Sequence, residues 1–496
     1  MSGLGMLILP AMVLVGGAFF VYMLARLLKL SNRAEALLTV AVLAGSLVAY
    51  FVIFIQTPSN VGELGAAVGQ ASTGGILYQP SSIGVFVLIL STIITALVAV
   101  YSGEYLKHDP RYLLYYPLLL LTQVGLFGIF MSKDLFNLFL LTELTTVVAS
   151  ALIAFRFHQE IAIKAGFKYL LMSSLGTMLM LLGIYFVYQS LGDLRLIEIL
   201  ATPDRFTRIG SACFLVGFSL KAGVVPLHTW VPDVYGHAPS AVSGLLAGVL
   251  SKSMLLILPV ICLRLGMSRV ELGVFLMVFG CVNMLLGSVR MLGQNLLRRL
   301  LSFSSIAQTG YLMFGLGIGF YFDLPEAFAA GLFLFLVIGL MKSLAFLSAG
   351  IYEFYTGSQD VDRLRGAGLR MRWTGLSFST ALASLAGIPL LAGFTGKWLI
   401  FSAAIRTGDI FAAICLAVFL VSTVIGLAGY LPLLVKQYLP GDENRIVSTG
   451  GGSFEGVSPW MLAPVLLLAL LIFVIGVYPD PWIELVNTVM NWTAFL

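Results

Sequence analysis

The stretch from Leu215 to Ser253, LVGFSLKAGVVPLHTWVPDVYGHAPSAVSGLLAGVLSKS, places two lysines and two histidines inside otherwise apolar sequence. Pro226 follows Lys221 by five residues and lacks the backbone N–H that the carbonyl of Ala222 would accept in a helix. This pattern predicts a broken helix. In a membrane, such a break is stable only where protein or trapped water satisfies the freed backbone groups. We therefore expect Lys221 to point into the protein.

Two further ionisable residues in this stretch extend that expectation. His228 follows Lys221 by seven residues, which on a continuous helix would place both on one face, about 10 Å apart. Lys252 lies midway along the next apolar run, residues 239–265. Charged residues on neighbouring membrane helices typically mark ion pathways. The stretch therefore predicts an ion relay rather than a membrane anchor.

The composition is typical of membrane proteins. Of the 496 residues, 59% are hydrophobic and only 10% are charged, and the mean hydropathy is +1.01, far outside the range of soluble domains. We therefore predict an all-α polytopic membrane protein with about 14 transmembrane helices of about 20 residues each. The expected helices are centred near residues 15, 46, 92, 121, 145, 176, 221, 252, 280, 310, 338, 388, 423 and 472.

Motifs for other functions are missing from the sequence. The cysteines occur singly inside apolar runs, without the spacing of an iron–sulfur or zinc site; they are Cys213, Cys262, Cys281 and Cys415. Neither a Gly-rich dinucleotide fingerprint nor a P-loop occurs. In a membrane protein of this size a net charge of +5 does not indicate nucleic-acid binding. We expect no cofactor in this chain and no nucleic-acid partner.

Lysines outnumber carboxylates inside the apolar runs, where Glu143 is the one carboxylate that we place deep in a helix. A lysine at a helix centre costs roughly 2.5 to 3.5 kcal/mol on insertion scales, so compensation is required. We expect a deep Glu143–Lys221 ion pair whose making and breaking moves protons. Lys168 lies near the start of its run, where snorkelling is as good an explanation as a relay role. The candidate ion-translocation residues are Glu143, Lys168, Lys221, His228, Lys252, Lys342 and Lys397.

A second proline-interrupted run, STALASLAGIPLLAGFTGKW, resembles the first. Pro389 frees the carbonyl of Leu385, and Lys397 lies just beyond the break. The two broken helices, the seventh and the twelfth in the predicted order, are five helices apart. This spacing predicts two inverted five-helix repeats, helices four to eight and nine to thirteen. The expected units are residues 1–102, a scaffold without ionisable residues in its helix cores; 103–265 and 266–440, the two ion-translocation halves; and 441–496, a cytoplasmic loop and the last helix.

The distribution of basic residues predicts the orientation. Loops after odd-numbered predicted helices carry 16 Lys and Arg, whereas loops after even-numbered ones carry 7. Because cytoplasmic loops carry the excess of basic residues, we expect the polar loop at residues 441–458 to face the cytoplasm and both termini to lie on the other side of the cell membrane.

At these residues the chain resembles the antiporter-like membrane subunits of respiratory complex I and the Mrp cation/proton antiporters. The resemblance rests on KDLFNLFLLTEL, LKAGVVPLHTWVPDVYGHAPSAVSGLLAGVLSK, RRLLSFSSIAQTGY and GIPLLAGFTGKW. It implies roles for the family's glutamate at Glu143 and its lysines at Lys221, Lys252 and Lys397. Ile338 stands where many relatives carry a histidine, four residues before Lys342.

The resemblance implies movement of protons, or their exchange for sodium, while redox centres reside in partner chains. Lys397, WVPDVY and GKWLIFSAAI resemble the N-type subunit of complex I, whereas PLHTW and APSAVSGLLAG resemble the Mrp D-type. Three possibilities stay open: a subunit of a redox-driven pump such as a complex I-like oxidoreductase or an energy-converting hydrogenase, an Mrp D-type subunit, or, less favoured, a self-contained solute transporter. The expected partners are other membrane subunits, including antiporter-like homologues, possible redox subunits, and lipid.

Overall fold

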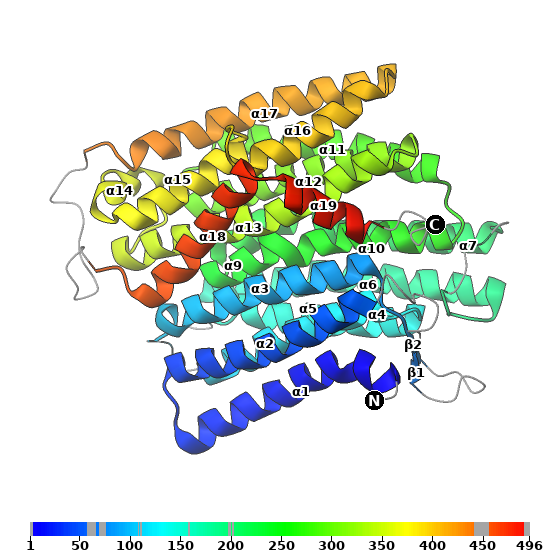
Figure 1. Cartoon of the computed structure of the whole chain (residues 1–496), viewed down its shortest axis with the longest axis horizontal. Coiled ribbons are helices and arrows are strands. Elements are labelled where there is room, and N and C mark those ends of the chain that lie inside the picture. The colour runs from blue at the N-terminus through cyan, green and yellow to red at the C-terminus, as the bar shows by residue number, and fades with distance from the viewer. Residues whose placement is uncertain are drawn as a thin grey trace.

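The protein is a bundle of long helices that run in roughly the same direction (Figure 1). The computed structural model describes residues 3–56, 66–68, 76–107, 109, 112–156, 159–196, 200, 203–440 and 456–490. The first long helices are α1 Gly3–Leu28, α2 Asn32–Gln56, α3 Ser82–Tyr105, α4 Tyr112–Met131, α5 Leu135–Ile153, α6 Glu160–Leu191 and α7 Arg205–Ala222. A short antiparallel hairpin, β1 Ala66–Val68 and β2 Ile76–Tyr78, pairs Ala66 with Tyr78.

The middle of the chain alternates short and long helices. Around the first break lie the 3₁₀ helix η2 Leu227–Trp230, α8 Val231–His237, α9 Ser240–Leu245, the π-helical turn η3 Leu246–Leu250 and α10 Ser251–Arg264. Three long helices follow: α11 Arg269–Leu292, α12 Leu297–Tyr321 and α13 Pro325–Thr356. The remaining elements are the 3₁₀ helix η4 Val361–Leu364, α14 Ala367–Arg370, α15 Arg372–Ala386, α16 Ala392–Arg406, α17 Ile410–Lys436, α18 Pro459–Val477 and α19 Asp480–Val489.

The predicted membrane helices are confirmed as helices, and two of them differ from the rest, one in hydropathy and one in being broken. Within the described residues, twelve helical segments are long and apolar enough to cross a membrane. The predicted run near residue 310 is α12, which is long enough but carries polar residues at Ser302, Ser304, Ser305 and Gln308 that lower its mean hydropathy. The predicted run near residue 388 is the broken pair α15 and α16. The two inverted five-helix repeats stay a prediction.

The core of the bundle lies where the sequence places its buried lysines. In α13 the most apolar window is buried throughout, and the α9–α10 segment is almost as fully buried. In α1, α2, α17 and α18 only a third of the corresponding window is buried. Lys252 and Lys342 therefore lie at the centre of the bundle rather than at its lipid-facing surface.

Both predicted helix breaks are present, but glycine ends each helix before the proline is reached. Gly223 caps the end of α7, with φ +72, and Gly387 caps the end of α15, with φ +87. A residue with positive φ at this position closes a helix and is usually glycine. The prolines that follow cannot donate the N–H bond that a continued helix would need. The sequences KAGVVP and LAGIP thus form the same local structure twice.

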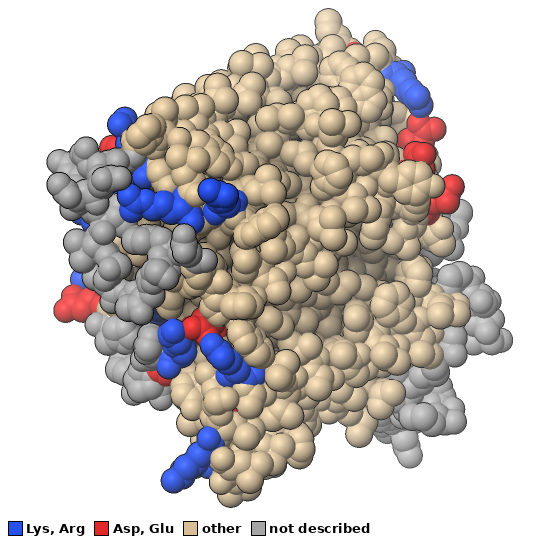
Figure 2. Space-filling view, turned by 60° about the vertical axis from the view of Figure 1, so that its left-hand side comes forward, with Lys and Arg blue, Asp and Glu red and all other residues tan. Residues whose placement is uncertain are grey.

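The surface separates into an apolar belt and two charged rims. Figure 2 shows a broad face almost free of charged side chains, with most of the visible Lys and Arg at one rim. The link between α1 and α2 and the short helix α14 lie at one end of the bundle, and the β-hairpin lies at the other (Figure 1). This is the surface that a membrane-spanning protein presents, because charged side chains avoid the hydrocarbon layer.

Close helix packing predicts a sensitive glycine in α12. A Cβ added at Gly310 would lie 2.5 Å from both the carbonyl oxygen of Gly280 and the amide nitrogen of Met284 on α11. Replacing Gly310 by Ala should therefore force the two backbones apart and destabilise the protein by about 1–3 kcal/mol. The measurement is the melting temperature of the purified protein in detergent. Gly16→Ala is the matched control, because a Cβ there meets nothing within 4 Å; equal melting temperatures for the two variants would contradict this packing.

Candidate functional site

The first element of the site is Lys221 at the end of α7. The side chain is 6% exposed, and its Nζ donates hydrogen bonds to Thr146 Oγ1 at 2.6 Å and Ser173 Oγ at 2.9 Å. These hydroxyl groups lie on α5 and α6 and also contact each other, at 3.3 Å. The helix end is held at this junction because the Leu220 carbonyl accepts from Trp230 Nε1 beyond the break, at 3.0 Å, and from the Gly223 N–H, at 3.2 Å. Lys221 thus points into the protein, as the sequence predicts.

The predicted direct ion pair between Glu143 and Lys221 is wrong. Within the described part of the chain, no carboxylate lies within ion-pair distance of Lys221 Nζ. Glu143 instead accepts hydrogen bonds from Ser174 Oγ at 3.2 Å and Thr177 Oγ1 at 3.0 Å. The reason is that hydroxyl side chains of α6 lie between the two charges. The groups belong to one polar cluster, but the link between them passes through α6.

A small cavity extends the cluster from Lys221 toward α10. It has about 20 Å³ accessible to water, which is room for about one water molecule. Its polar lining comes from Thr142, Thr145, Thr146, Tyr169, Lys221 and Ser251. Ser251 hydrogen-bonds to Tyr235, and the ring of Tyr235 lies 5.9 Å from Lys252 Nζ. The cavity therefore connects the surroundings of Lys221 with those of Lys252.

Two adjacent serines of α12 each contact one of the central lysines. Lys252 Nζ donates to Ser305 Oγ at 2.5 Å, and Lys342 Nζ donates to Ser304 Oγ at 2.5 Å. Lys342 also donates to the carbonyl of Leu301 at 3.1 Å. Ser304 further contacts the Tyr430 hydroxyl of α17. Lysines from α10 and α13 thus meet on one turn of a third helix.

Lys397 fills the second helix break. Its Nζ donates to the carbonyls of Leu385 at 2.9 Å and Ala386 at 3.3 Å, which the break leaves without helical partners. The ring of Tyr311 lies 4.7 Å from this ammonium group, a cation–π contact. Gln308 of α12 donates to the same Leu385 carbonyl at 3.4 Å. The sequence predicts that Pro389 leaves the Leu385 carbonyl without a helical partner, and the structure shows Lys397 donating to it.

Seen together, these groups form a row of ionisable and hydroxyl side chains through the middle of the bundle. The row runs from Glu143 on α5 to Lys397 on α16, and its four lysines are each at most 6% exposed. Hydroxyl groups both donate and accept hydrogen bonds, so they can relay a proton between lysines that do not touch. The arrangement is chemically suited to passing protons from one helix of the bundle to the next.

Lys168 and His228 lie beside this row. Lys168 forms an ion pair with Asp233 of α8, which explains its position without snorkelling. The expectation that His228 shares a helix face with Lys221 is wrong, because α7 ends at Ala222 and a new 3₁₀ turn begins at Leu227. His228 is partly exposed, and its Nδ1 has no hydrogen-bond partner among the described residues.

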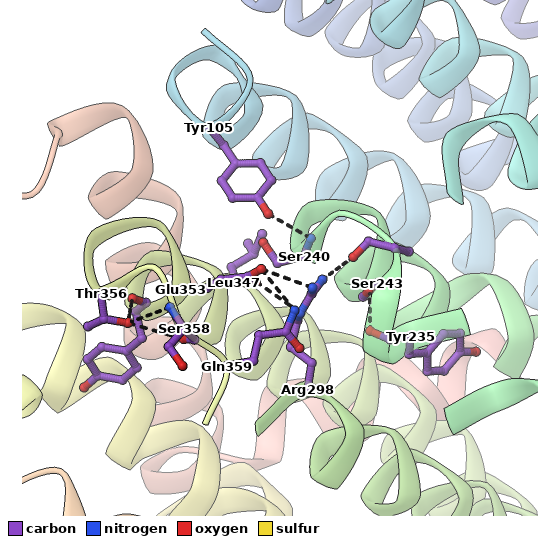
Figure 3. A network of polar contacts seen from close by, with 12 residues as sticks. Tyr105, Tyr235, Ser240, Ser243, Arg298, Leu347, Glu353, Thr356, Ser358 and Gln359 are labelled. Atoms are coloured by element: carbon purple, nitrogen blue, oxygen red, sulfur yellow. Dashed lines mark hydrogen bonds and ion pairs between the residues drawn. The ribbon is translucent and has the colours of Figure 1, made fainter. Parts of the chain in front are cut away.

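A second polar network, which the sequence did not predict, lies at one end of α12 and α13. Figure 3 shows Arg298 between the α8–α9 connection and Glu353. Arg298 donates to the carbonyl of Ala238 and lies 3.2 Å from a carboxylate oxygen of Glu353, which also accepts from Gln359 at 3.0 Å. Glu353 follows Lys342 by eleven residues, about three helical turns, so both lie on one face of α13. That spacing is the sequence signal that could have identified it.

Two further ionisable residues, Glu35 and Lys133, lie outside the predicted set of site residues. Glu35, in the first turn of α2, is fully buried, and neither carboxylate oxygen has a partner among the described residues. Glu35 is therefore a buried carboxylate at the start of a membrane helix, which the sequence analysis did not single out. Lys133 lies between α4 and α5, beside a cavity of about 40 Å³. Burial, aided by the nearby Arg264, lowers the pKa of Lys133 to about 7.

Two of the cysteines lie in contact, with the Cys281 thiol donating to the carbonyl of Cys415 at 3.8 Å. All four cysteines are free thiols. Within the ranges that the structure describes, no group of three His, Cys, Asp or Glu side chains is placed to hold a metal ion.

The sequence has clear relatives. The family model described as NADH:quinone oxidoreductase/Mrp antiporter, TM matches residues 132–426. F(420)H(2) dehydrogenase subunit N of Methanosarcina mazei is 30% identical over 409 residues, covering 79% of this chain and 80% of the relative. NADH-quinone oxidoreductase subunit N of Chromohalobacter salexigens is 31% identical over 501 residues, covering 97% and 98%.

Solved structures share the fold. A chain of the membrane-bound sulfane sulfur reductase, an archaeal respiratory membrane complex, superposes with a TM-score of 0.83 at 23% identity and covers 99% of both chains. A chain of the Mrp complex from a Dietzia species has a TM-score of 0.81 at 22% identity and covers 99% of this chain and 97% of that one. At these identities the likeness concerns the fold alone.

Proposed function

Since the chain belongs to the NADH:quinone oxidoreductase/Mrp antiporter membrane family, we propose that it is an ion-translocating membrane subunit of a multi-subunit redox-driven pump. Its relatives are named as N subunits of NADH-quinone oxidoreductase and F(420)H(2) dehydrogenase. In this proposal partner chains carry out the redox reaction, and this chain moves protons, or exchanges them for sodium.

The observation that carries the proposal is the row from Glu143 to Lys397. Burying four lysines in one chain costs free energy that a purely structural protein has no reason to spend. A buried ammonium group is stable only with compensating partners. Their partners here are mostly hydroxyl and carbonyl groups, which stabilise an ammonium group without fixing its charge as a carboxylate would. Such a lysine can release and regain a proton, which a permanent ion pair disfavours.

In each step one proton moves from a protonated lysine to a neutral one, so the total charge of the row is unchanged. A protonated lysine donates to a neighbouring serine or threonine hydroxyl, or to a water, as that group passes its own proton onward to the next neutral lysine. Ser305 and Ser304 are placed for this transfer between Lys252 and Lys342. The water-sized cavity beside Thr146 is placed for it between Lys221 and α10. Ile338, fully buried one turn before Lys342, contributes no proton-carrying group.

The Mrp alternative is not favoured. Its sequence support was PLHTW and APSAVSGLLAG, and the Mrp structure matches at 22% identity, which speaks for the shared fold alone. The relatives with higher identity over most of the chain are N subunits of redox enzymes. We therefore retain the redox-driven pump as the proposed function.

The proposal is tested by driving the assembled complex in sealed vesicles and recording ion movement. Internal acidification that needs the redox substrate and continues without sodium would identify protons as the transported ion. Acidification that requires sodium would identify exchange. Redox turnover with no movement of either ion, in vesicles shown to be tight, would contradict the proposed function.

The expected membrane orientation can be tested with two single cysteines. Ser31 lies exposed between α1 and α2, at the end where we expect the cytoplasm. Arg195 lies exposed beyond α6, at the other end. A membrane-impermeant maleimide should label Ser31→Cys only from the cytoplasmic side and Arg195→Cys only from the opposite side. The reverse pattern would overturn the orientation. The expected loop at 441–458 falls largely outside the described residues.

The proposal also places every cofactor in partner chains. The complex should lose haem, flavin and iron–sulfur absorbance together with its redox subunits when these are stripped from the membrane part. A cofactor that stays with this chain in stoichiometric amount would contradict that assignment.

A further inference from the structure

The connection between α13 and α15 is strongly basic. Within ten residues it carries four arginines: Arg363, Arg365, Arg370 and Arg372. Of the two aspartates before them, Asp362 pairs with Lys436 at 2.7 Å, and Asp360 caps the η4 turn. Arg363, Arg365 and Arg372 are exposed and have no ion pair or side-chain hydrogen bond with any described residue. These three arginines therefore present positive charge at the surface of this segment.

A pocket lies against this basic segment. It has a volume of about 490 Å³ and is bordered by Arg370, Arg372, Trp373, Thr374, Leu369 and Leu462. Thr374 is 1% exposed, and its Oγ1 has no hydrogen-bond partner among the described residues. Buried hydroxyl groups are normally hydrogen-bonded. Guanidinium and hydroxyl donors around one pocket match the oxygen acceptors of a phosphate group.

The rim of the pocket is apolar and exposed. Trp373 is 60% exposed, Leu369 53% and Leu376, one turn further along α15, 55%. The pocket lies at the end of the bundle where α14 is drawn in Figure 1, next to the start of α18. Tryptophan is enriched at membrane interfaces, where one end of the ring is wet and the other is apolar. A ligand at this position meets cations on one side and membrane-facing hydrocarbon on the other.

We propose that this pocket binds the phosphate headgroup of an anionic phospholipid. The phosphate would lie between Arg370, Arg372 and the hydroxyl of Thr374, and an acyl chain would follow the exposed surface of Trp373 and Leu376. A water-soluble phosphate would use the arginines but not the apolar rim. An acidic protein segment would need no hydrophobic surface beside its carboxylates. The combination of both features favours a lipid, and basic pockets at helix ends are suited to such headgroups.

The test uses the assembled complex in phosphatidylcholine vesicles that contain a photoactivatable phosphatidylglycerol, with crosslinked peptides mapped after illumination. Labelling should occur on the segments around residues 369–374 and 457–462. The double variant R370Q/R372Q should lower it by roughly 25-fold, about fivefold for each arginine near a membrane surface. The matched control R26Q/K29Q removes the same charge from the same end of the bundle and should leave labelling within about twofold. Thr374→Val should reduce labelling without a change of charge.

Three results would overturn the proposal. They are equal labelling by a photoactivatable phosphatidylcholine, labelling unchanged in R370Q/R372Q, and labelling abolished by excess inorganic phosphate, which would identify a site for free anions. If R370Q/R372Q fails to assemble on a native gel, R370K/R372K keeps the charge but not the paired guanidinium donors. It should assemble and retain intermediate labelling, and labelling at the wild-type level would contradict recognition by the guanidinium groups. The readout is independent of ion movement, so its failure would leave the proposed function untouched.

Discussion

Lys221→Met should lower the rate of ion translocation about 100-fold or more, the loss typical of a positioned proton carrier. Methionine keeps much of the volume of the lysine stem, so the surrounding helices should pack normally. It cannot carry a proton, and it leaves Thr146 and Ser173 without their shared donor. The measurement is substrate-driven ion movement in vesicles that hold the assembled complex, with assembly checked on a native gel.

Lys164→Met is the matched control for this prediction. Lys164 lies on α6 and is exposed, with a side chain 75% accessible and paired weakly with Glu160 at 3.5 Å. The substitution removes the same charge but touches no part of the buried row, so translocation should be close to that of the wild type. Near-normal translocation in Lys221→Met would refute the relay, whatever the likeness to known proteins.

The geometry also predicts how Glu143 and Lys221 combine. Hydroxyl groups of α6 separate the two charges, so Glu143→Gln should slow ion translocation only by disturbing the polar cluster that both residues share. The double variant, Glu143→Gln with Lys221→Met, should therefore be no slower than Lys221→Met alone. Removing the two hydroxyl groups that Lys221 contacts, Thr146→Val with Ser173→Ala, should slow translocation while both charges remain. A double variant much slower than either single one would show that the two charges act independently.

Ser304→Ala with Ser305→Ala should reduce ion translocation at least about tenfold, because it removes the hydroxyl groups between Lys252 and Lys342. Each buried ammonium group would also lose a hydrogen-bond partner, at a cost of about 1–3 kcal/mol. The same vesicle measurement applies, with melting temperature recorded in parallel. The loss of translocation should exceed any loss of assembled complex.

Helix α12 supplies its own control for that experiment. Ser302 is equally buried, but its hydroxyl donates to the carbonyl of Arg298 within the same helix, at 2.7 Å. Ser302→Ala should therefore leave translocation nearly unchanged. Ser304→Thr with Ser305→Thr keeps both hydroxyl groups and should restore most of the activity. If threonine fails to restore it and Ser302→Ala is equally harmful, the effect is one of packing rather than of proton transfer.

Much of this protein follows from local sequence alone. Apolar runs of membrane length predict the helices, because no other secondary structure satisfies a single backbone segment in lipid. The glycine and proline of KAGVVP and LAGIP predict both helix breaks, since φ and the missing donor are properties of those residues themselves. Lys221, Lys252, Lys342 and Lys397 were recognisable because a charge inside such a run is rare and costly.

Only the tertiary structure decided which groups these lysines contact. Lys221 meets Thr146, which is 75 residues away in sequence, and Lys252 meets Ser305, which is 53 away. Hydroxyl residues are common on membrane helices, so nothing in their local sequence distinguishes a relay group from one that bonds its own helix, as Ser302 does. The separation of Glu143 from Lys221, the pairing of Lys168 with Asp233 and the burial of Glu35 all depend on how helices pack. The sequence alone determined where charge enters the membrane, and the packing of distant helices decided how those charges connect.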